Sequence, residues 1–108
     1  MKRGDLVTVA LRGDYGKPRP ALVIQSDFFN THRSVTVLPI TGDLREVPLF
    51  RITLQPDEMN GLRKPSQIVV DKAVTVTRTK LGPRFGNLST DLMLEVSRRL
   101  AIFLGIAK

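Results

Sequence analysis

The sequence contains no cysteine, no tryptophan and a single histidine among its 108 residues. The lack of cysteine excludes disulfide bonds, thiol nucleophiles and cysteine-ligated zinc sites. One histidine, His32, excludes a two-histidine acid/base site within one chain and a histidine-rich metal centre. With one tyrosine and five phenylalanines, the chain also does not favour a sheet that binds RNA by stacking several bases on aromatic rings. We therefore expect no metal and no other cofactor.

Long apolar runs are absent as well. The longest stretches, around residues 21–24 and 100–107, fall far short of the roughly 18 apolar residues that a membrane-spanning helix needs. The basic start at Lys2 and Arg3 is not followed by the uninterrupted apolar segment of a secretory signal. We expect a soluble, cytoplasmic protein that does not contact membranes.

The charge balance is strongly positive. Seventeen lysines and arginines face ten acids, which gives a formal charge of +7. Apolar residues make up 42% and charged residues 25% of the chain, as in ordinary globular proteins. A chain of this length supports one core, so we expect a single domain over residues 1–108. Its positive charge then lies on a folded surface and favours a polyanionic partner.

Alternating apolar and polar residues predict short strands along most of the chain. The expected strands cover residues 5–11, 20–26, 35–40, 47–54, 66–70 and 73–78. The strand at 20–26 is apolar through its middle, which predicts a strand covered on both faces. Pro39 cannot donate a ladder hydrogen bond and therefore marks a strand end or an edge. The segment Gly82 to Gly86 is expected to be a turn, and residues 55–65 form the longest irregular segment.

From Ser89 onward the spacing becomes helical. Leu92, Val96, Leu100 and Phe103 recur at intervals of four, four and three residues, which predicts one apolar helical face. Ser89 is placed to cap this helix and Gly105 to end it. The chain is therefore mainly β with a C-terminal α-helix: a small, strongly bent sheet or barrel with one helix packed against it.

The basic residues are the most informative functional signal. We expect a loop at residues 12–19 that carries Tyr15, the one aromatic side chain well placed to stack on a base. A second basic stretch runs from Arg63 to Arg84, with Asp71 as its only acid. Lysines and arginines neutralise phosphates and release counterions, so both segments favour binding of a nucleic acid. The two sets of basic residues are Arg12, Lys17 and Arg19 in the loop, and Arg63, Lys64, Lys72, Arg78, Lys80 and Arg84 in the later stretch.

Other candidate motifs are weak. His32 lies in a polar turn, where a solvated or hydrogen-bonded loop residue is the favoured interpretation over substrate contact. The adjacent acids Asp57 and Glu58 are interpreted as a solvated loop, since two neighbours rarely complete a coordination sphere. No nucleotide-binding glycine motif and no nucleophile elbow is present.

Four strings of sequence carry a specific resemblance. These strings are KRGDLV, GKPRPALVIQSD, VTVLPIT and GLRKPSQIVVDK, and they start at Lys2, Gly16, Val35 and Gly61. In order and spacing the chain resembles the MazF/PemK family of toxin endoribonucleases across nearly its whole length. The resemblance implies an SH3-like barrel, a homodimer, metal-independent cleavage of single-stranded RNA at a short sequence, and neutralisation by a cognate acidic antitoxin.

The same resemblance implies the catalytic residues. The family's arginine before the proline of the second strand falls on Arg19, and its threonine at the end of the third strand falls on Thr41. An acidic position used by some members aligns with Asp71, but their arginine two residues earlier is replaced here by Val69. A histidine that some members carry in the first loop is also missing. These departures leave the general base and the general acid open.

Physical chemistry supports these assignments. Cleavage through the RNA's own 2′-hydroxyl needs a proton acceptor, stabilisation of the charge on phosphorus and a donor to the leaving 5′-oxygen. The fork of Arg19 matches phosphate oxygens, Thr41 is able to hydrogen-bond the phosphate or the 2′-hydroxyl, and Asp71 is the candidate general base. The expected RNA-contacting side chains are Arg12, Tyr15, Lys17, Gln67, Lys72, Arg78 and Lys80.

Two alternatives stay open at this point. The segments that start at Ser26 and Leu88 are also similar to the CcdB toxins, which share the barrel but poison DNA gyrase. In that family the helix ends in a Trp-Gly-Ile tail, whereas this chain has Leu104, Gly105 and Ile106 followed by two more residues. The other alternative is a barrel that binds nucleic acid without cleaving it.

Overall fold

The computed structural model describes residues 1–11 and 17–107, and within them the chain forms seven strands, three short 3-10 helices and one α-helix. The strands are β1 (Asp5–Ala10), β2 (Pro18–Val23), β3 (Ser34–Thr41), β4 (Arg51–Leu54), β5 (Ser66–Val69), β6 (Val74–Thr77) and β7 (Leu81–Asn87). The helices are η1 (Asp27–Phe29), η2 (Val70–Lys72), η3 (Arg78–Lys80) and α1 (Thr90–Phe103). The expected mainly β class with one C-terminal helix is confirmed.

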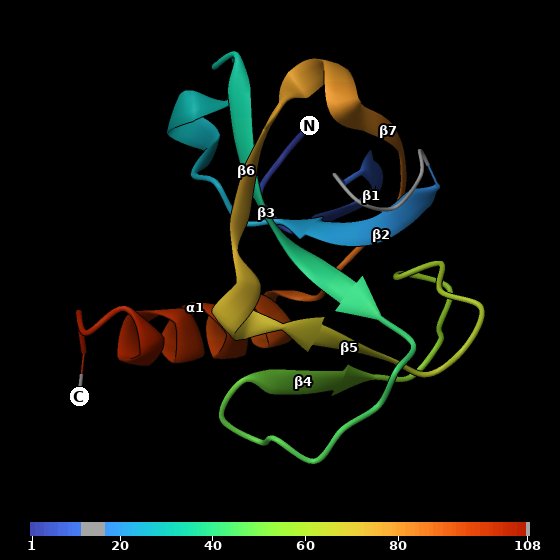
Figure 1. Ribbon diagram of the computed structural model, residues 1–108, viewed down its shortest axis with the longest axis vertical. Helices are drawn as coiled ribbons and strands as arrows, with labels where there is room; N and C mark the ends of the chain where they lie inside the picture. The colour runs from blue at the N-terminus through green and yellow to red at the C-terminus, as the bar shows by residue number, and fades with distance from the viewer. Residues whose placement is uncertain (12–16, 108) are drawn as a thin grey trace.

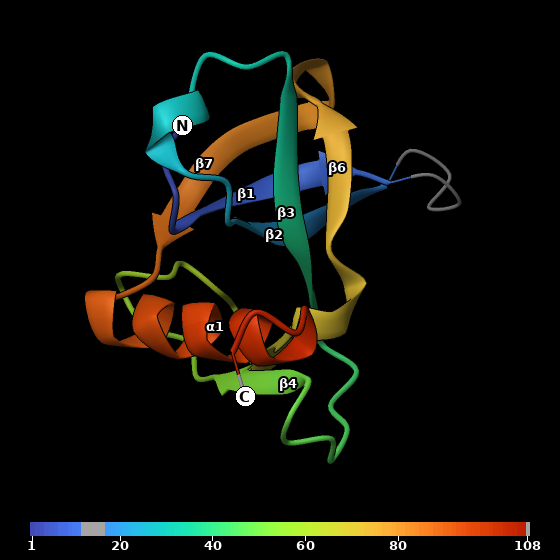
Figure 2. The same cartoon turned by 90° about the vertical axis from the view of Figure 1, so that its left-hand side faces the viewer.

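Strand β3 joins the two halves of the antiparallel sheet. The strand order is β4-β5-β3-β2-β1-β7, and β6 pairs with the first half of β3. In Figure 1, β3 starts at the top beside β6, passes β2 and ends in an arrowhead above β5 and β4. In Figure 2, α1 lies beside β4 and below the upper strands. The sheet is therefore strongly bent, as expected.

Side-chain alternation divides the apolar residues of β1, β2 and β3 between two clusters. One cluster, which includes Leu6, Leu22, Leu38 and Ile40, packs against Val96 and Leu100 of α1. The other is built from smaller residues on the opposite face and is called the valine cluster here. The valine cluster consists of Val7, Val9, Ala21, Val23, Val35 and Val37. The strand predicted to be covered on both faces is covered on both faces.

The position of Pro39 follows from the change of partner along β3. Residues 34–37 pair with β6, whereas Ile40 and Thr41 pair with β5. Pro39 lies between these two ladders, where the missing N–H interrupts neither of them. The expectation that it marks a strand end is wrong, since β3 continues to Thr41, but it does stand where one edge of the strand changes partner.

Several predicted boundaries are wrong. The strand expected at residues 20–26 already ends at Val23. Arg19 belongs to strand β2 rather than to a loop, since β2 begins at Pro18. Of the strand expected at 47–54, only Arg51–Leu54 forms, because residues 48–50 make a turn closed by the Phe50 N–H and the Val47 carbonyl (3.0 Å). The turn expected from Gly82 to Gly86 is part of β7 instead.

The glycines of β7 serve close approach of neighbouring chain segments. A Cβ atom on Gly86 would clash with the Asn60 carbonyl oxygen and lie 2.8 Å from the Met59 carbonyl oxygen. The Asn87 N–H also donates to the Met59 carbonyl (2.9 Å). Gly86 thus allows the long 55–65 segment to pack directly on β7, and it is a strand residue despite its low strand propensity.

The α1 helix has the expected ends. The Ser89 hydroxyl accepts a hydrogen bond from the Leu92 N–H (3.2 Å), and Gly105 adopts the left-handed φ of 77° that favours glycine after a helix. Val96 and Leu100 are buried, whereas Phe103 is 45% exposed and leaves the apolar face incomplete at its last position. No helix in residues 1–11 and 17–107 has the length and apolar character to cross a membrane.

We expect Gly86→Ala to lower the free energy of unfolding by about 1–3 kcal/mol, because the atoms that the new Cβ would meet are backbone and cannot swing aside. Chemical denaturation measures the loss. As a control, Gly105→Ala adds a Cβ that meets no atom within 4 Å and costs only the strain of its positive φ, about 1 kcal/mol. An equal or smaller loss for Gly86→Ala would contradict this packing.

Glu95 on α1 binds Arg99, which links the helix to the first residue of β4. Its carboxylate accepts hydrogen bonds from Arg98 and Arg99, which lower its pKa from 4.5 to about 2. Arg99 also donates to the Arg51 carbonyl oxygen (3.1 Å). The interaction therefore stabilises the fold above pH 4.5, and its contribution is lost as the pH falls toward 2.

We expect Glu95→Gln to reduce the melting temperature at pH 7 and to approach the wild-type value near pH 2, where the wild-type carboxylate is half protonated in the folded state and almost fully protonated in the unfolded state. Thermal unfolding followed by circular dichroism over this pH range checks the result. A deficit that stays constant down to pH 2 would show that the charge of Glu95 does not contribute.

Candidate active site

Arg19 and Thr41 lie on neighbouring strands and face the same cleft. The last pair of the β2–β3 ladder is Ala21 with Pro39, and Arg19 and Thr41 each lie two residues beyond that pair on their own strand. Arg19 lies two residues from Ala21, and Thr41 lies four residues from Val37. Because side chains alternate along a strand, both extend from the face of the sheet that carries the valine cluster. The resulting cleft of about 510 Å³ is lined by Leu11, Pro18, Arg19, Pro20, Pro39, Ile40, Thr41, Gly42, Lys64 and Ser66.

The hydroxyl of Thr41 has a structural partner. It accepts a hydrogen bond from the Asp43 N–H (3.0 Å), which holds the turn that follows β3. The Asp43 carbonyl oxygen in turn accepts from Arg51 (2.9 Å). A hydroxyl that accepts one bond still has a proton to donate, so Thr41 is able to donate a hydrogen bond into the cleft.

Gln67 is the direct strand partner of Thr41, and Thr53 is the partner of Gln67 on β4. Gln67 is buried, with only 6% of its surface exposed. The amide oxygen accepts from the Arg45 N–H (3.0 Å) and from Arg51 (3.1 Å), and the amide nitrogen donates to Thr53 (3.1 Å). Gln67 thus fixes the turn after Thr41, and its contact with RNA stays a prediction.

Asp71 is not brought to the cleft. It lies half-buried in η2, and β5 runs away from Thr41 in the direction of η2. It is not among the residues that line the cleft. Its assignment as a general base stays a prediction.

The expected RNA-contacting residues divide into separate groups. Lys17 is exposed immediately before β2 and close in sequence to Arg19, and Lys72 is exposed at the end of η2. Arg78 and Lys80 lie in η3, which follows the Thr77–Ser34 pair at the opposite end of β3 from Thr41. The seven residue steps of strand from Ser34 to Thr41 correspond to roughly 23 Å of chain. Arg12 and Tyr15 lie outside the described residues.

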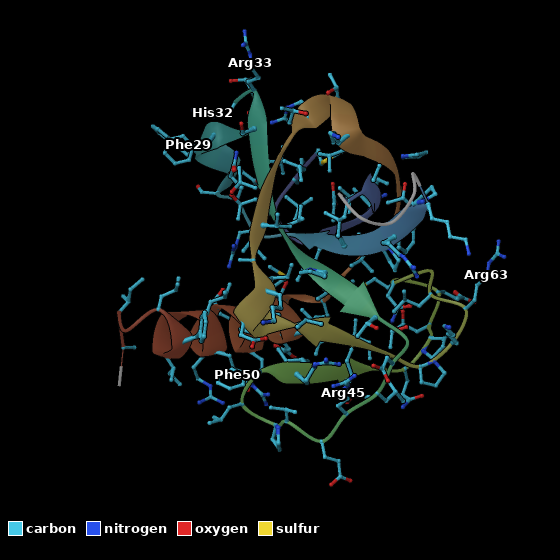
Figure 3. The ribbon with its side chains drawn as sticks, in the orientation of Figure 1. Phe29, His32, Arg33, Arg45, Phe50 and Arg63 are labelled. Atoms are coloured by element: carbon cyan, nitrogen blue, oxygen red, sulfur yellow. The ribbon has the colours of Figure 1, made fainter. Side chains whose placement is uncertain are left out.

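Arg78 and Arg84 have partners within the protein. The Arg78 side chain donates to the carbonyl of His32 (2.8 Å), so the loop that carries His32 is hydrogen-bonded as favoured. Arg84 forms an ion pair with the buried Asp5 (2.9 Å). Figure 3 shows Arg33 and His32 at the far end of β3 from the side on which Arg63 lies. The fold therefore separates the basic residues of the later stretch from one another.

Sequence reasoning did not identify Lys64 as part of the cleft. The 55–65 segment folds back on the sheet through Asn60, whose buried side chain donates to the Gln55 carbonyl (2.8 Å) and accepts from the Leu62 N–H (3.0 Å). This brings Lys64 against Gly42, next to Thr41. No local pattern signals such a contact between residues 22 positions apart in the sequence.

The described residues contain no group of three histidine, cysteine, aspartate or glutamate side chains arranged to hold a metal ion. Asp57 instead accepts a hydrogen bond from the Asn60 N–H (2.7 Å) and belongs to the turn network of the 55–65 segment.

Comparison with known proteins identifies the family. Residues 2–104 match the family described as PemK-like, MazF-like toxin of type II toxin-antitoxin system. The chain is 46% identical over 108 residues to a probable endoribonuclease MazF of Mycolicibacterium smegmatis, with 99% of each chain covered. It is 36% identical over 86 residues to endoribonuclease MazF6 of Mycobacterium tuberculosis, which covers 78% of this chain and 75% of that protein.

The fold is similar to those of solved toxins. A mycobacterial endoribonuclease in complex with its cognate antitoxin has a TM-score of 0.83 at 21% identity and covers 100% of this chain and 98% of its own. The Mycobacterium tuberculosis toxin MazF-mt6 has a TM-score of 0.82 at 23% identity, with 96% and 99% covered. Of the two toxin resemblances in the sequence, the first is the one that these comparisons support. The chain belongs to the PemK-like, MazF-like toxins of type II toxin-antitoxin systems.

Proposed function

We propose that this protein is the toxin of a type II toxin-antitoxin pair and cleaves single-stranded messenger RNA at a short sequence, which stops translation and growth. The endoribonuclease activity follows from membership of the family and from the relative that is 46% identical over its full length. The observation that carries the proposal is that Arg19 and Thr41 line the same cleft.

The chemistry uses the RNA's own 2′-hydroxyl as the nucleophile. Its oxygen attacks the adjacent phosphorus, the 2′-proton leaves to a base, and the bond to the 5′-oxygen breaks as that oxygen receives a proton. The two groups in the cleft have distinct tasks. Arg19 stabilises the charge that develops on the phosphate oxygens, and Thr41 donates a hydrogen bond to a phosphate oxygen.

We do not propose Arg19 as the group that accepts the 2′-proton or protonates the 5′-oxygen. A guanidinium keeps its proton at every relevant pH, so Arg19 serves as a fixed charge rather than as a proton donor. Asp71 is the candidate base carried over from the family, although it lies outside the cleft of its own chain. Electrostatic stabilisation by Arg19 requires no metal ion, and we propose that none takes part.

The partner that restrains the toxin is an acidic antitoxin. A structure of similar fold is an endoribonuclease in complex with its cognate antitoxin, and the charge of +7 favours an acidic segment. We propose that this segment occupies the cleft and so competes with RNA. Since messenger RNA is the substrate, the site of action is the cytoplasm.

We also propose that the protein acts as a homodimer. Several large apolar side chains are exposed at the end of α1 and on the segment before β4, which fits a surface covered by a second copy. They are Leu49, Ile102, Phe103, Leu104 and Ile106.

We expect the wild-type protein to cleave single-stranded RNA in EDTA, and Arg19→Ala to lower the cleavage rate by about 10²–10³-fold or more, because the charge on the phosphate is then unsupported. Time courses on RNA of mixed sequence, with sequencing of the new ends, measure the rate and the cut site. Arg33→Ala is the matched control, since Arg33 is an exposed arginine at the far end of β3.

Two results would overturn the proposed function. One is intact RNA after incubation with folded wild-type protein, with binding but no shortening. The other is inhibition of DNA supercoiling by gyrase that disappears on deletion of Leu104 and the residues after it.

We expect Thr41→Val to lose most of the cleavage activity and about 1 kcal/mol of stability, because the Asp43 N–H loses its acceptor. Thr41→Ser keeps the hydroxyl and is expected to retain both. Cleavage rates and chemical denaturation of the two variants separate the catalytic from the structural effect. Full activity of Thr41→Val would exclude the hydroxyl from the reaction.

A further inference from the structure

Lys64 lies between the Arg19–Thr41 cleft and a second depression. The second depression has a volume of about 890 Å³ and shares Pro18, Pro20, Lys64 and Ser66 with the cleft. It continues toward Leu62 and the ring of Phe85, so its wall is mostly apolar. The two hollows therefore form one groove, and Lys64 is the cation where they meet.

Contacts with Gly42 and with Ser66 fix the position of Lys64. A Cβ atom placed on Gly42 would lie 2.5 Å from Lys64 Cε and 2.7 Å from Lys64 Nζ, so the ammonium group rests against a residue that has no side chain. The Ser66 hydroxyl donates to the Lys64 carbonyl oxygen (3.0 Å), and Pro65 stiffens the link between them. Among the described residues, no carboxylate lies within ion-pair distance of Lys64.

We propose that this groove contains a second nucleotide subsite, in which Lys64 binds the phosphate next to the one that is cleaved and the depression toward Phe85 takes the base of that neighbouring nucleotide. The inference rests on the proposed function, because it needs an RNA strand with its scissile phosphate at Arg19. Continuity with the cleft places the neighbouring nucleotide there. An ammonium group matches a phosphate, and the apolar wall matches the flat face of a base.

This arrangement makes Lys64 a residue that positions the substrate. A contact to a phosphate that does not react is present equally in the bound state and in the transition state, so its loss raises KM more than it lowers kcat. Gly42 acts through Lys64, since an alanine there displaces the ammonium group from its resting place. Gly42 has no left-handed φ, so alanine at this position meets only the flexible lysine side chain.

The test uses an RNA oligonucleotide that contains the mapped cut site. We expect Lys64→Met to raise KM about tenfold, Lys64→Arg to stay close to wild type, and Gly42→Ala to raise KM without further effect in the Lys64→Met background. For binding of an oligonucleotide with a 2′-deoxy residue at the cut, the slope of log K against log salt falls by about 0.7 in Lys64→Met. Lys2→Met is the control for loss of one exposed lysine. Thermal unfolding verifies that each variant is folded.

Modified substrates locate the contact. A neutral methylphosphonate is placed at the linkage on either side of the cut, in two separate oligonucleotides. One of the two is expected to raise the wild-type KM about tenfold and to have no further effect on Lys64→Met. An abasic residue on that same side is expected to raise KM as well. Lys64→Met with wild-type KM, additive effects of variant and methylphosphonate, or an unchanged KM for the abasic oligonucleotide would each overturn the subsite. Wild-type protein that cuts no RNA would instead overturn the proposed function.

Discussion

The register of β3 between β2 and β5 is the constraint on which the site depends. On one side of β3, Ala21 pairs with Pro39, and Arg19 and Thr41 beyond this pair line one cleft. On the other side, Thr41 pairs with Gln67, which pairs with Thr53 of β4. Because side chains alternate between faces, a shift of one residue would move Arg19 and Thr41 into the helix-side core. The two apolar clusters, one on each face, exclude that shift.

Hydrogen bonds in the turn that follows β3 make the cleft rigid. The Thr41 hydroxyl accepts a hydrogen bond from the Asp43 N–H, and the Asp43 carbonyl oxygen accepts one from Arg51. The amide oxygen of Gln67 accepts hydrogen bonds from Arg51 and from the Arg45 N–H. All of these groups are polar and satisfied, so the turn is fixed by hydrogen bonds rather than by burial of apolar surface. A fixed donor and a fixed charge are what electrostatic stabilisation of a phosphate requires, since little reorganisation is then needed during the reaction.

Much of the fold could be predicted because its signals are local. Alternating apolar and polar residues predict β1, and the spacing of Leu92, Val96 and Leu100 predicts α1. Both patterns involve residues that are close in sequence. The misassigned β7 shows the limit: Gly82 and Gly86 have the composition of a turn, but they are glycines because neighbouring segments pack too closely for a Cβ. That crowding exists only after the chain has folded.

The candidate site likewise contains residues that the sequence predicts and residues whose position depends on the folded chain. Arg19 and Thr41 were predictable because each lies in a string of sequence typical of the family. Lys64 was not, because its place in the cleft depends on the Asn60 network that folds the 55–65 segment back. Asp71 is the opposite case: the family alignment selects it, but it is not among the residues that line the cleft, and its role as a base stays a prediction.

The most direct test of the account is a titration of the protein with an RNA oligonucleotide that is uncleavable because it carries a 2′-deoxy residue at the cut nucleotide, followed by backbone amide chemical shifts. We expect the largest changes on residues 19–23, 40–43 and 64–67, around Arg19, Thr41 and Lys64. Changes confined to residues 32–34 and 78–80, at the other end of β3, with the cleft unaffected, would contradict it.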